Sequence, residues 1–200
     1  MKYQISMAPM EGLTGYVYRR AHHAYFAPLD TYYTPFISNK KLGSRERHDV
    51  LPEHNEGMHV IPQILTNRAD DFLEIEKQLY EYGYREVNLN LGCPSGTVTA
   101  KGRGAGFLAY PEELSKFLDQ IYSKTRMKIS VKTRIGISSE EEWPQLLTLF
   151  NKFPIDHLII HPRLLQDFYK GYPHMDAYQY AKEHSFCLLY TSPSPRDGLL

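Results

Sequence analysis

Four side chains that can contact a polar ligand stand near the ends of segments that are typical of buried strands: Gln63, Asn90, Lys132 and His161. The lysine supplies a positive charge, and the amides supply hydrogen-bond donors and acceptors. Burying an ammonium group without an acceptor is costly, so an inward lysine that converges with three other polar groups indicates a polar ligand. Taken singly, each residue also has a structural interpretation, as a loop contact or a packed core side chain.

A fifth reactive group lies between a glycine and a proline in the stretch LGCPSGT, where the thiol of Cys93 follows a predicted strand. A cysteine is often a small buried hydrophobic residue, but Gly92 and Pro94 indicate a turn at the strand end, which weakens that interpretation. The other cysteine, Cys187, is expected to be a packing residue. Two cysteines make neither a disulfide framework nor a metal cluster, and they are typical of a reducing compartment.

Strand-like and helix-like segments alternate from the start of this 200-residue chain, which predicts βα units around a parallel sheet. Asn67 is expected to cap the clearest helix, which Gly83 would end, and the polar stretch from Asn39 to Gly57 is expected to be poor in helix. The predicted strands are 3–9, 30–38, 59–65, 85–92, 128–134 and 157–163, with a possible seventh from 186. The other predicted helices are 15–26, 111–125, 139–153 and 175–185.

The predicted fold class is α/β, an incomplete TIM-type (β/α)8 barrel with about six strands. A doubly wound open sheet would also fit alternating units, but no Gly-rich fingerprint follows the first strand. A complete barrel typically needs about 250 residues, more than this chain has. In such barrels the active site lies at the carboxyl ends of the strands, which is where the four polar residues fall.

Alternation along each strand predicts which side chains face the barrel interior. In strand 85–92, Val87, Leu89 and Leu91 should face the helices, while Asn88 and Asn90 should face inward. The same rule sends Ile129, Val131 and Thr133 outward, and it sends Ser130, Lys132, Arg134, His161 and Arg163 inward.

Residues 1–185 are expected to form a truncated catalytic barrel, and 186–200 a doubtful tail. The ending TSPSPRDGLL resembles a translated adapter or vector read-through; a natural disordered terminus is the alternative. The 23 basic and 23 acidic side chains cancel, so overall charge indicates neither a nucleic acid nor a membrane surface as partner. The N-terminus has no signal-peptide core and no run is long enough for a membrane span, which predicts a cytoplasmic protein.

Several motifs together resemble the tRNA-dihydrouridine synthases: APMEGLTG at 8–15, LPEHN at 51–55, NLNLGCPSGTVTAKGRGAGFL at 88–108, VKTRIG at 131–136 and IHPR at 160–163. Members of that family are flavin mononucleotide (FMN) oxidoreductases that reduce the C5=C6 bond of particular uridines in tRNA. NADPH usually supplies the electrons. The resemblance extends from about residue 3 to residue 185, and it departs from the family at Gly15, where many relatives have aspartate, and at IHPR, which replaces His-Gly-Arg.

The resemblance implies roles for individual residues. Cys93 matches the catalytic acid, which protonates uracil C5 on the face opposite to hydride delivery at C6. Lys132 would stabilise the anionic reduced flavin. The implied cofactor-binding residues are Pro9, Met10, Glu11, Gln63, Lys132 and His161, and the implied contacts to the target uracil are Asn90, Arg134 and Arg163.

The loop after Cys93 carries Lys101 and Arg103 and no acidic residue between Asn90 and Pro111, so it could approach tRNA phosphate. An ordinary solvated loop is the alternative. The uridine must leave the tRNA stack to reach a barrel mouth, as in base flipping.

The family's flavin-phosphate loops and its C-terminal helical tRNA-binding domain lie beyond the end of this sequence. We therefore expect the 200-residue chain itself to bind FMN poorly and to be inactive, and the full-length protein to be a monomer. Two other readings stay open: another FMN barrel acting on a pyrimidine, similar to dihydroorotate dehydrogenase, and a non-catalytic fragment with at most weak RNA binding.

Overall fold

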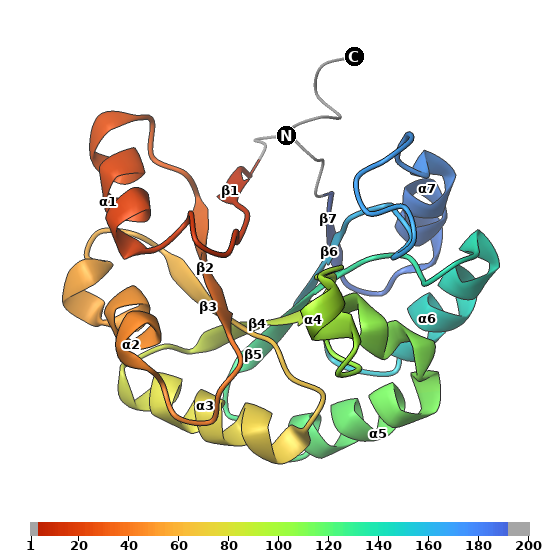
Figure 1. The fold of residues 1–200 in the computed structure, drawn as a ribbon, viewed down its shortest axis with the longest axis horizontal. Helices are drawn as coiled ribbons and strands as arrows, with labels where there is room; N and C mark the ends of the chain where they lie inside the picture. Colours follow the sequence, from red (N-terminus) through yellow and green to blue (C-terminus); the bar gives the residue numbers. More distant parts are fainter. Residues whose placement is uncertain (1–3, 192–200) are drawn as a thin grey trace.

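A computed structural model of the chain describes residues 4–191, and its core is one seven-stranded parallel sheet. The strands follow one another in chain order, and the sheet curls so that helices cover its outer side (Figure 1). The strands are β1 (Ser6–Met7), β2 (Thr31–Ile37), β3 (Val60–Ile64), β4 (Glu86–Leu91), β5 (Lys128–Thr133), β6 (His157–Ile160) and β7 (Leu188–Thr191). The predicted incomplete (β/α) barrel is confirmed.

Among residues 4–191, seven α-helices connect or flank the strands, together with three short 3-10 helices. The α-helices are α1 (Tyr16–Tyr25), α2 (Ser44–Val50), α3 (Ala69–Glu81), α4 (Gly96–Thr99), α5 (Pro111–Tyr122), α6 (Trp143–Phe150) and α7 (Met175–His184). The 3-10 helices are η1 (Pro52–His54), η2 (Gly104–Ala109) and η3 (Glu140–Glu142).

The main hydrophobic core lies between the outer face of the sheet and the helices. In β4, Val87, Leu89 and Leu91 are fully buried there, as their alternation predicts. Ile129 and Val131 of β5 belong to the same core. Because alternate residues point the other way, Asn88 and Asn90 lie on the inner face, and the predicted polarity of this strand is confirmed.

The register of the central strands brings polar residues side by side on the inner face. Gln63 pairs with Asn88 across β3 and β4, and Asn90 pairs with Lys132 across β4 and β5. The backbone pairing continues past the end of β6, since the His161 N–H donates to Thr133 O. Because the strands are parallel, these groups lie toward the same end of the half-barrel.

The possible seventh strand is present, because Leu188–Thr191 pairs in parallel with β6. Ordered structure therefore extends beyond residue 185, where the sequence analysis placed the barrel's end. Residues 192–200, which hold most of the proposed tail, lie outside the described residues. Within residues 4–191 no strand pairing joins β7 to β1, so the sheet is an open half-barrel.

The expectation that residues 39–57 are poor in helix was wrong, because α2 and η1 lie there. This segment has few apolar residues, so it carries no helical periodicity. Its order comes from polar contacts: Arg19 of α1 is fully buried and donates to the Asp49 carbonyl and to Asn55 Oδ1. An ion pair of 3.7 Å between Arg19 and the Asp49 carboxylate adds to this.

The predicted cap of α3 was also wrong, since Arg68 occupies the N-cap position without a side-chain cap bond. The Asn67 amide instead donates to Lys101 O, in the segment that follows the cysteine turn. The predicted end of the helix is confirmed, because Gly83 has φ +95° and its N–H donates to Tyr80 O.

Truncating the centre of the core should destabilise the whole half-barrel. We expect Leu89→Ala to lower the free energy of unfolding by about 3 kcal/mol, because it leaves a cavity between β4 and the helices. The measurement is urea unfolding followed by circular dichroism. Glu113→Ala, on the exposed side of α5, is the matched control, and an equal loss in both variants would contradict the position of Leu89 in the core.

Candidate active site

A chain of hydrogen bonds between side-chain amides crosses the inner face of the central strands. The Asn90 amide donates to Gln63 Oε1 at 2.7 Å, and the Gln63 amide donates to Asn88 Oδ1 at 2.7 Å. The Asn88 amide donates to Ser130 Oγ at 2.9 Å. All four residues are buried, and each group in the chain satisfies the next, as buried polar groups require.

This chain ends at the cysteine turn. Asn90 Oδ1 accepts hydrogen bonds from the backbone N–H groups of Gly92, at 3.0 Å, and Cys93, at 2.9 Å. The Cys93 carbonyl accepts from Ala105 N at 3.0 Å, so η2 holds the turn from its other side. The Cys93 thiol is free and half-buried. Asn90 is thus placed to orient the turn that presents the thiol.

Two glycines allow η2 to pack closely against this turn. Gly104 has φ +56°, and a Cβ atom there would lie 2.7 Å from Cys93 O and 3.1 Å from Cys93 Cβ. A Cβ atom at Gly106 would lie 2.9 Å from the backbone of Thr99 in α4. Larger residues cannot enter at either position without moving the cysteine segment.

Lys132 lines a cavity of about 200 Å³ at the inner side of the half-barrel. Its other walls come from β1 and the turn after it, from β2, and from β6 and β7; they include Pro9, Tyr33, Ile159 and Tyr190. Burial lowers the pKa of Lys132 to about 8, with Arg134 adding to the effect and Cys93 opposing it. Within residues 4–191 no hydrogen bond or ion pair of the Lys132 ammonium is found, so the cavity presents an available cation.

The floor of this cavity rests on groups that the sequence analysis did not single out. Tyr33, from β2, makes a 2.9 Å hydrogen bond with His157 Nε2, from the start of β6. His157 Nδ1 lies 2.9 Å from the Asp156 carboxylate, and Lys128 lies 3.5 Å from the same carboxylate. Burial raises the pKa of Tyr33, so the phenol stays protonated. The alternation of side chains along β2 could have identified Tyr33 as facing inward. It could not have identified His157 as its partner, because that residue lies across the barrel.

Arg134 connects two loops at the site. Its Nε donates to Gly92 O at 3.1 Å, while its terminal nitrogens donate to Leu164 O and Phe168 O, both at 2.7 Å. Arg163 is also buried and donates to Lys170 O and Gly171 O. Both guanidinium groups therefore organise backbone in this conformation, and their predicted contact with uracil stays a prediction.

The first turn, after β1, is closed by Thr14, whose hydroxyl accepts from Met10 N at 2.8 Å. Of the three residues predicted to cradle the flavin, Pro9 lines the Lys132 cavity. The Met10 side chain is half exposed, and Glu11 forms an ion pair with Arg45. The structure thus brings Pro9 to Lys132 and leaves Met10 and Glu11 outside the set that lines the cavity.

The remaining predicted residues lie around this centre. His161 is buried, with its ring edge-on to Tyr169 at a centroid distance of 6.2 Å. Lys101 is exposed and Arg103 is half-buried, both in the segment between α4 and η2 that follows Cys93.

Two kinds of site are not found in the part of the chain that the structure describes. None of its helices combines the length and hydropathy that a membrane crossing needs. Residues 4–191 also contain no group of three or more His, Cys, Asp or Glu side chains arranged to hold a metal ion.

The close packing at Gly104 can be tested directly. We expect Gly104→Ala to lower the free energy of unfolding by about 2 kcal/mol, because the positive φ and the contact with Cys93 both oppose a Cβ atom. The rate at which iodoacetamide alkylates Cys93 should change as well. Gly96→Ala is the matched control, since nothing lies within 4 Å of its Cβ position and its φ is not positive. Equal behaviour of the two variants would contradict this packing.

The sequence is similar to those of known proteins. The sequence profile described as Dihydrouridine synthase (Dus) matches residues 6–183. A probable tRNA-dihydrouridine synthase of Staphylococcus epidermidis is 28% identical over 174 residues, which is 85% of this chain and 53% of that protein. A probable tRNA-dihydrouridine synthase 2 of Bacillus subtilis is 27% identical over 161 residues, which is 78% of this chain and 49% of that protein. The chain spans about half the length of these curated relatives, and it belongs to the dihydrouridine synthase family.

Proposed function

We propose that the protein to which this chain belongs reduces the C5=C6 bond of uridines in tRNA, with FMN as cofactor and NADPH as the source of electrons. The observation that carries the proposal is the placement of Cys93: buried amides hold its backbone at the mouth of the half-barrel, beside the strand that carries Lys132. Membership of the family and the names of the relatives support the same reaction.

The residues around the cavity fit a flat ring with polar edges. Tyr33, Tyr190, Ile159 and Pro9 offer apolar and aromatic walls, and Lys132 offers a cation without an acceptor of its own among residues 4–191. FMN would supply the hydride when bound. Gln63 and His161 are proposed to form hydrogen bonds to its ring; in this structure neither lines the cavity, and the Gln63 amide bonds to Asn88 and Asn90. The cavity is smaller than the roughly 300–1,000 Å³ of most ligand sites, in line with a pocket for part of the cofactor only.

The chain's own residues would perform two tasks in the reaction. The thiol of Cys93 would donate a proton to uracil C5, so it must be protonated and held in place when the substrate binds. The ammonium of Lys132 would balance negative charge within the cavity. Asn90, Arg134 and Arg163 are proposed contacts of the target uracil, and Lys101 and Arg103 are proposed contacts of tRNA phosphate.

For the 200-residue chain taken alone, we propose weak FMN binding and no uridine reduction. The first reason is that β1 and β7 leave two open edges in the sheet. The second is that the FMN phosphate needs backbone amides or a basic group to bind it. The full-length protein is proposed to act as a cytoplasmic monomer.

The proposed general acid is tested by Cys93→Ala in the full-length protein. We expect uridine reduction to slow by about a hundred-fold or more, because a positioned acid is lost. Flavin absorbance and the dissociation constant for tRNA should stay close to those of the parent protein. Cys187→Ala is the control, since Cys187 directly precedes β7 and its substitution should leave the rate unchanged. A single-turnover rate in Cys93→Ala equal to that of the parent would remove Cys93 from the mechanism.

The role of Lys132 predicts a specific pH dependence for binding of reduced FMN. Its lowered pKa of about 8 means that the free protein loses the ammonium charge above that pH. An anionic flavin ring bound beside Lys132 favours the protonated amine and raises its pKa. The affinity for reduced FMN should therefore be constant below about pH 8 and fall as the pH rises above it. The measurement is anaerobic fluorescence titration of reduced FMN from about pH 6.5 to about pH 9.5, a range that extends roughly 1.5 pH units on either side of that pKa.

Lys132→Met provides the comparison. It should bind reduced FMN more weakly than the parent at pH 7 and without the fall above pH 8, since no group remains there to titrate. Retention of the same pH profile in Lys132→Met would show that another group is responsible.

A further inference from the structure

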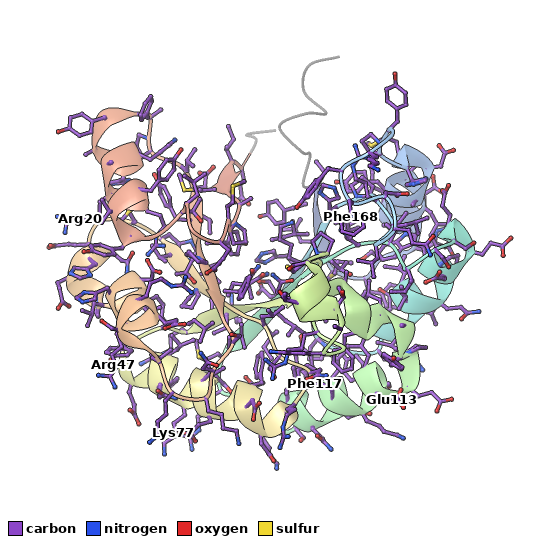
Figure 2. The ribbon with its side chains drawn as sticks, viewed as in Figure 1. Arg20, Arg47, Lys77, Glu113, Phe117 and Phe168 are labelled. Carbon is purple, nitrogen blue, oxygen red and sulfur yellow. The ribbon has the colours of Figure 1, made fainter. Side chains whose placement is uncertain are left out.

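Three exposed aromatic side chains stand on the segment between β6 and α7. Phe168 and Tyr169 are each 49% exposed, and Tyr172 is 75% exposed. Lys170, also exposed, lies between them in the stretch FYKGY. Phe168 lies near the opening of the half-barrel, well away from Lys77 on the outer side of α3 (Figure 2).

This segment is held firmly although its aromatic side chains are exposed. Phe168 has φ +50°, an uncommon conformation for a bulky residue, and the Arg134 guanidinium binds its carbonyl. Arg163 binds the carbonyls of Lys170 and Gly171. His174 lies 2.7 Å from the Glu140 carboxylate and 2.9 Å from that of Asp167, which closes the segment. The aromatic rings therefore project from backbone that is already organised.

The same contacts place the aromatic segment beside the cysteine turn. Arg134 bridges Phe168 O and Gly92 O, and Gly92 directly precedes Cys93. The Arg134 guanidinium also lies over the Tyr169 ring, 5.4 Å from its centroid. A ligand whose reacting group reaches Cys93 would therefore have its neighbouring groups close to these rings.

We propose that Phe168, Tyr169 and Tyr172 form a stacking platform for unpaired RNA bases next to the uridine that is reduced, with Lys170 against the RNA backbone. This inference rests on the proposed function. Aromatic rings stack on bases of any sequence, and a lysine among them supplies a phosphate contact. No carboxylate occurs between Phe168 and Met175, and Asp167 just before them is bound by His174 and by Leu164 N. Among residues 168–172 the exposed side chains are thus three aromatic rings and one lysine, and the nearby carboxylates of Asp167 and Glu140 are both paired with His174.

The other possible occupant is a protein segment that follows residue 191. Packing by such a segment requires apolar volume, whereas base stacking requires a planar ring. Leucine keeps most of the apolar volume without the ring, and an aromatic exchange keeps both. The two occupants therefore respond differently to the same pair of substitutions.

The experiment compares Phe168→Leu with Phe168→Tyr, and Tyr172→Leu with Tyr172→Phe, in the FMN-loaded full-length protein. Fluorescence anisotropy measures the dissociation constant for labelled tRNA, and thermal unfolding is measured in parallel. Each leucine variant should weaken binding by about tenfold, while the aromatic variants bind like the parent and all four unfold like the parent. Lys170→Gln should reduce the slope of log K against log salt concentration by about 1, the contribution of one phosphate contact. Lys77→Gln should leave that slope unchanged.

Unchanged affinity in both leucine variants, in a parent protein that reduces uridine, would overturn the platform and leave the proposed function standing. Lower thermal stability in the leucine variants with unchanged tRNA affinity would assign the rings to protein packing and also overturn it. A parent protein that neither binds tRNA nor reduces uridine would overturn both proposals.

Discussion

The hydrogen-bonded amides of Asn88, Gln63 and Asn90 are the interaction on which the site depends. Each of these amides is buried, and each donates one hydrogen bond and accepts at least one, so the oxygen and the nitrogen of every amide have a partner. Loss of one amide would leave its neighbours unsatisfied, at about 1–3 kcal/mol for each buried group. The bond from Asn88 to Ser130 extends this network from β3 and β4 to β5, so it supports the inner face of three strands. The cysteine turn is fixed to this network, because Asn90 Oδ1 accepts hydrogen bonds from the backbone N–H groups of Gly92 and Cys93.

A second constraint is the desolvation of the Lys132 ammonium, which has no carboxylate partner among residues 4–191. Desolvation and the neighbouring Arg134 both disfavour the ammonium form, which is why its pKa falls to about 8. A protein that only needed a packed interior could place an apolar residue at this position at less cost. The proposed flavin ring would offset that cost by offering acceptor atoms or negative charge, and the aromatic and apolar walls of the cavity suit a flat ring.

The parallel half-barrel and the inward direction of Asn88 and Asn90 could be predicted from sequence, because apolar residues alternate with them in β4. The partners of these residues could not. Which amide meets which depends on strand register, and the contact of Tyr33 with His157 joins residues 124 positions apart across the interior. Helix α2 was missed because Arg19, Asp49 and Asn55 stabilise its surroundings through polar contacts, which leave no periodic pattern. The predicted helix cap at Asn67 was wrong because its side-chain amide donates instead to the carbonyl of Lys101, in a loop 34 positions away in the sequence.

Arg134 explains why the separate loops around the site form one unit. A buried guanidinium needs its donors satisfied, and here three carbonyls from two loops satisfy them. If either loop moved away, a charged donor would lose its acceptor in a poorly hydrated place, which is more costly than losing a neutral hydrogen bond. The cysteine turn and the segment of Phe168 are therefore coupled through one side chain. A ligand that contacts either loop acts on a surface that the other loop helps to hold in position.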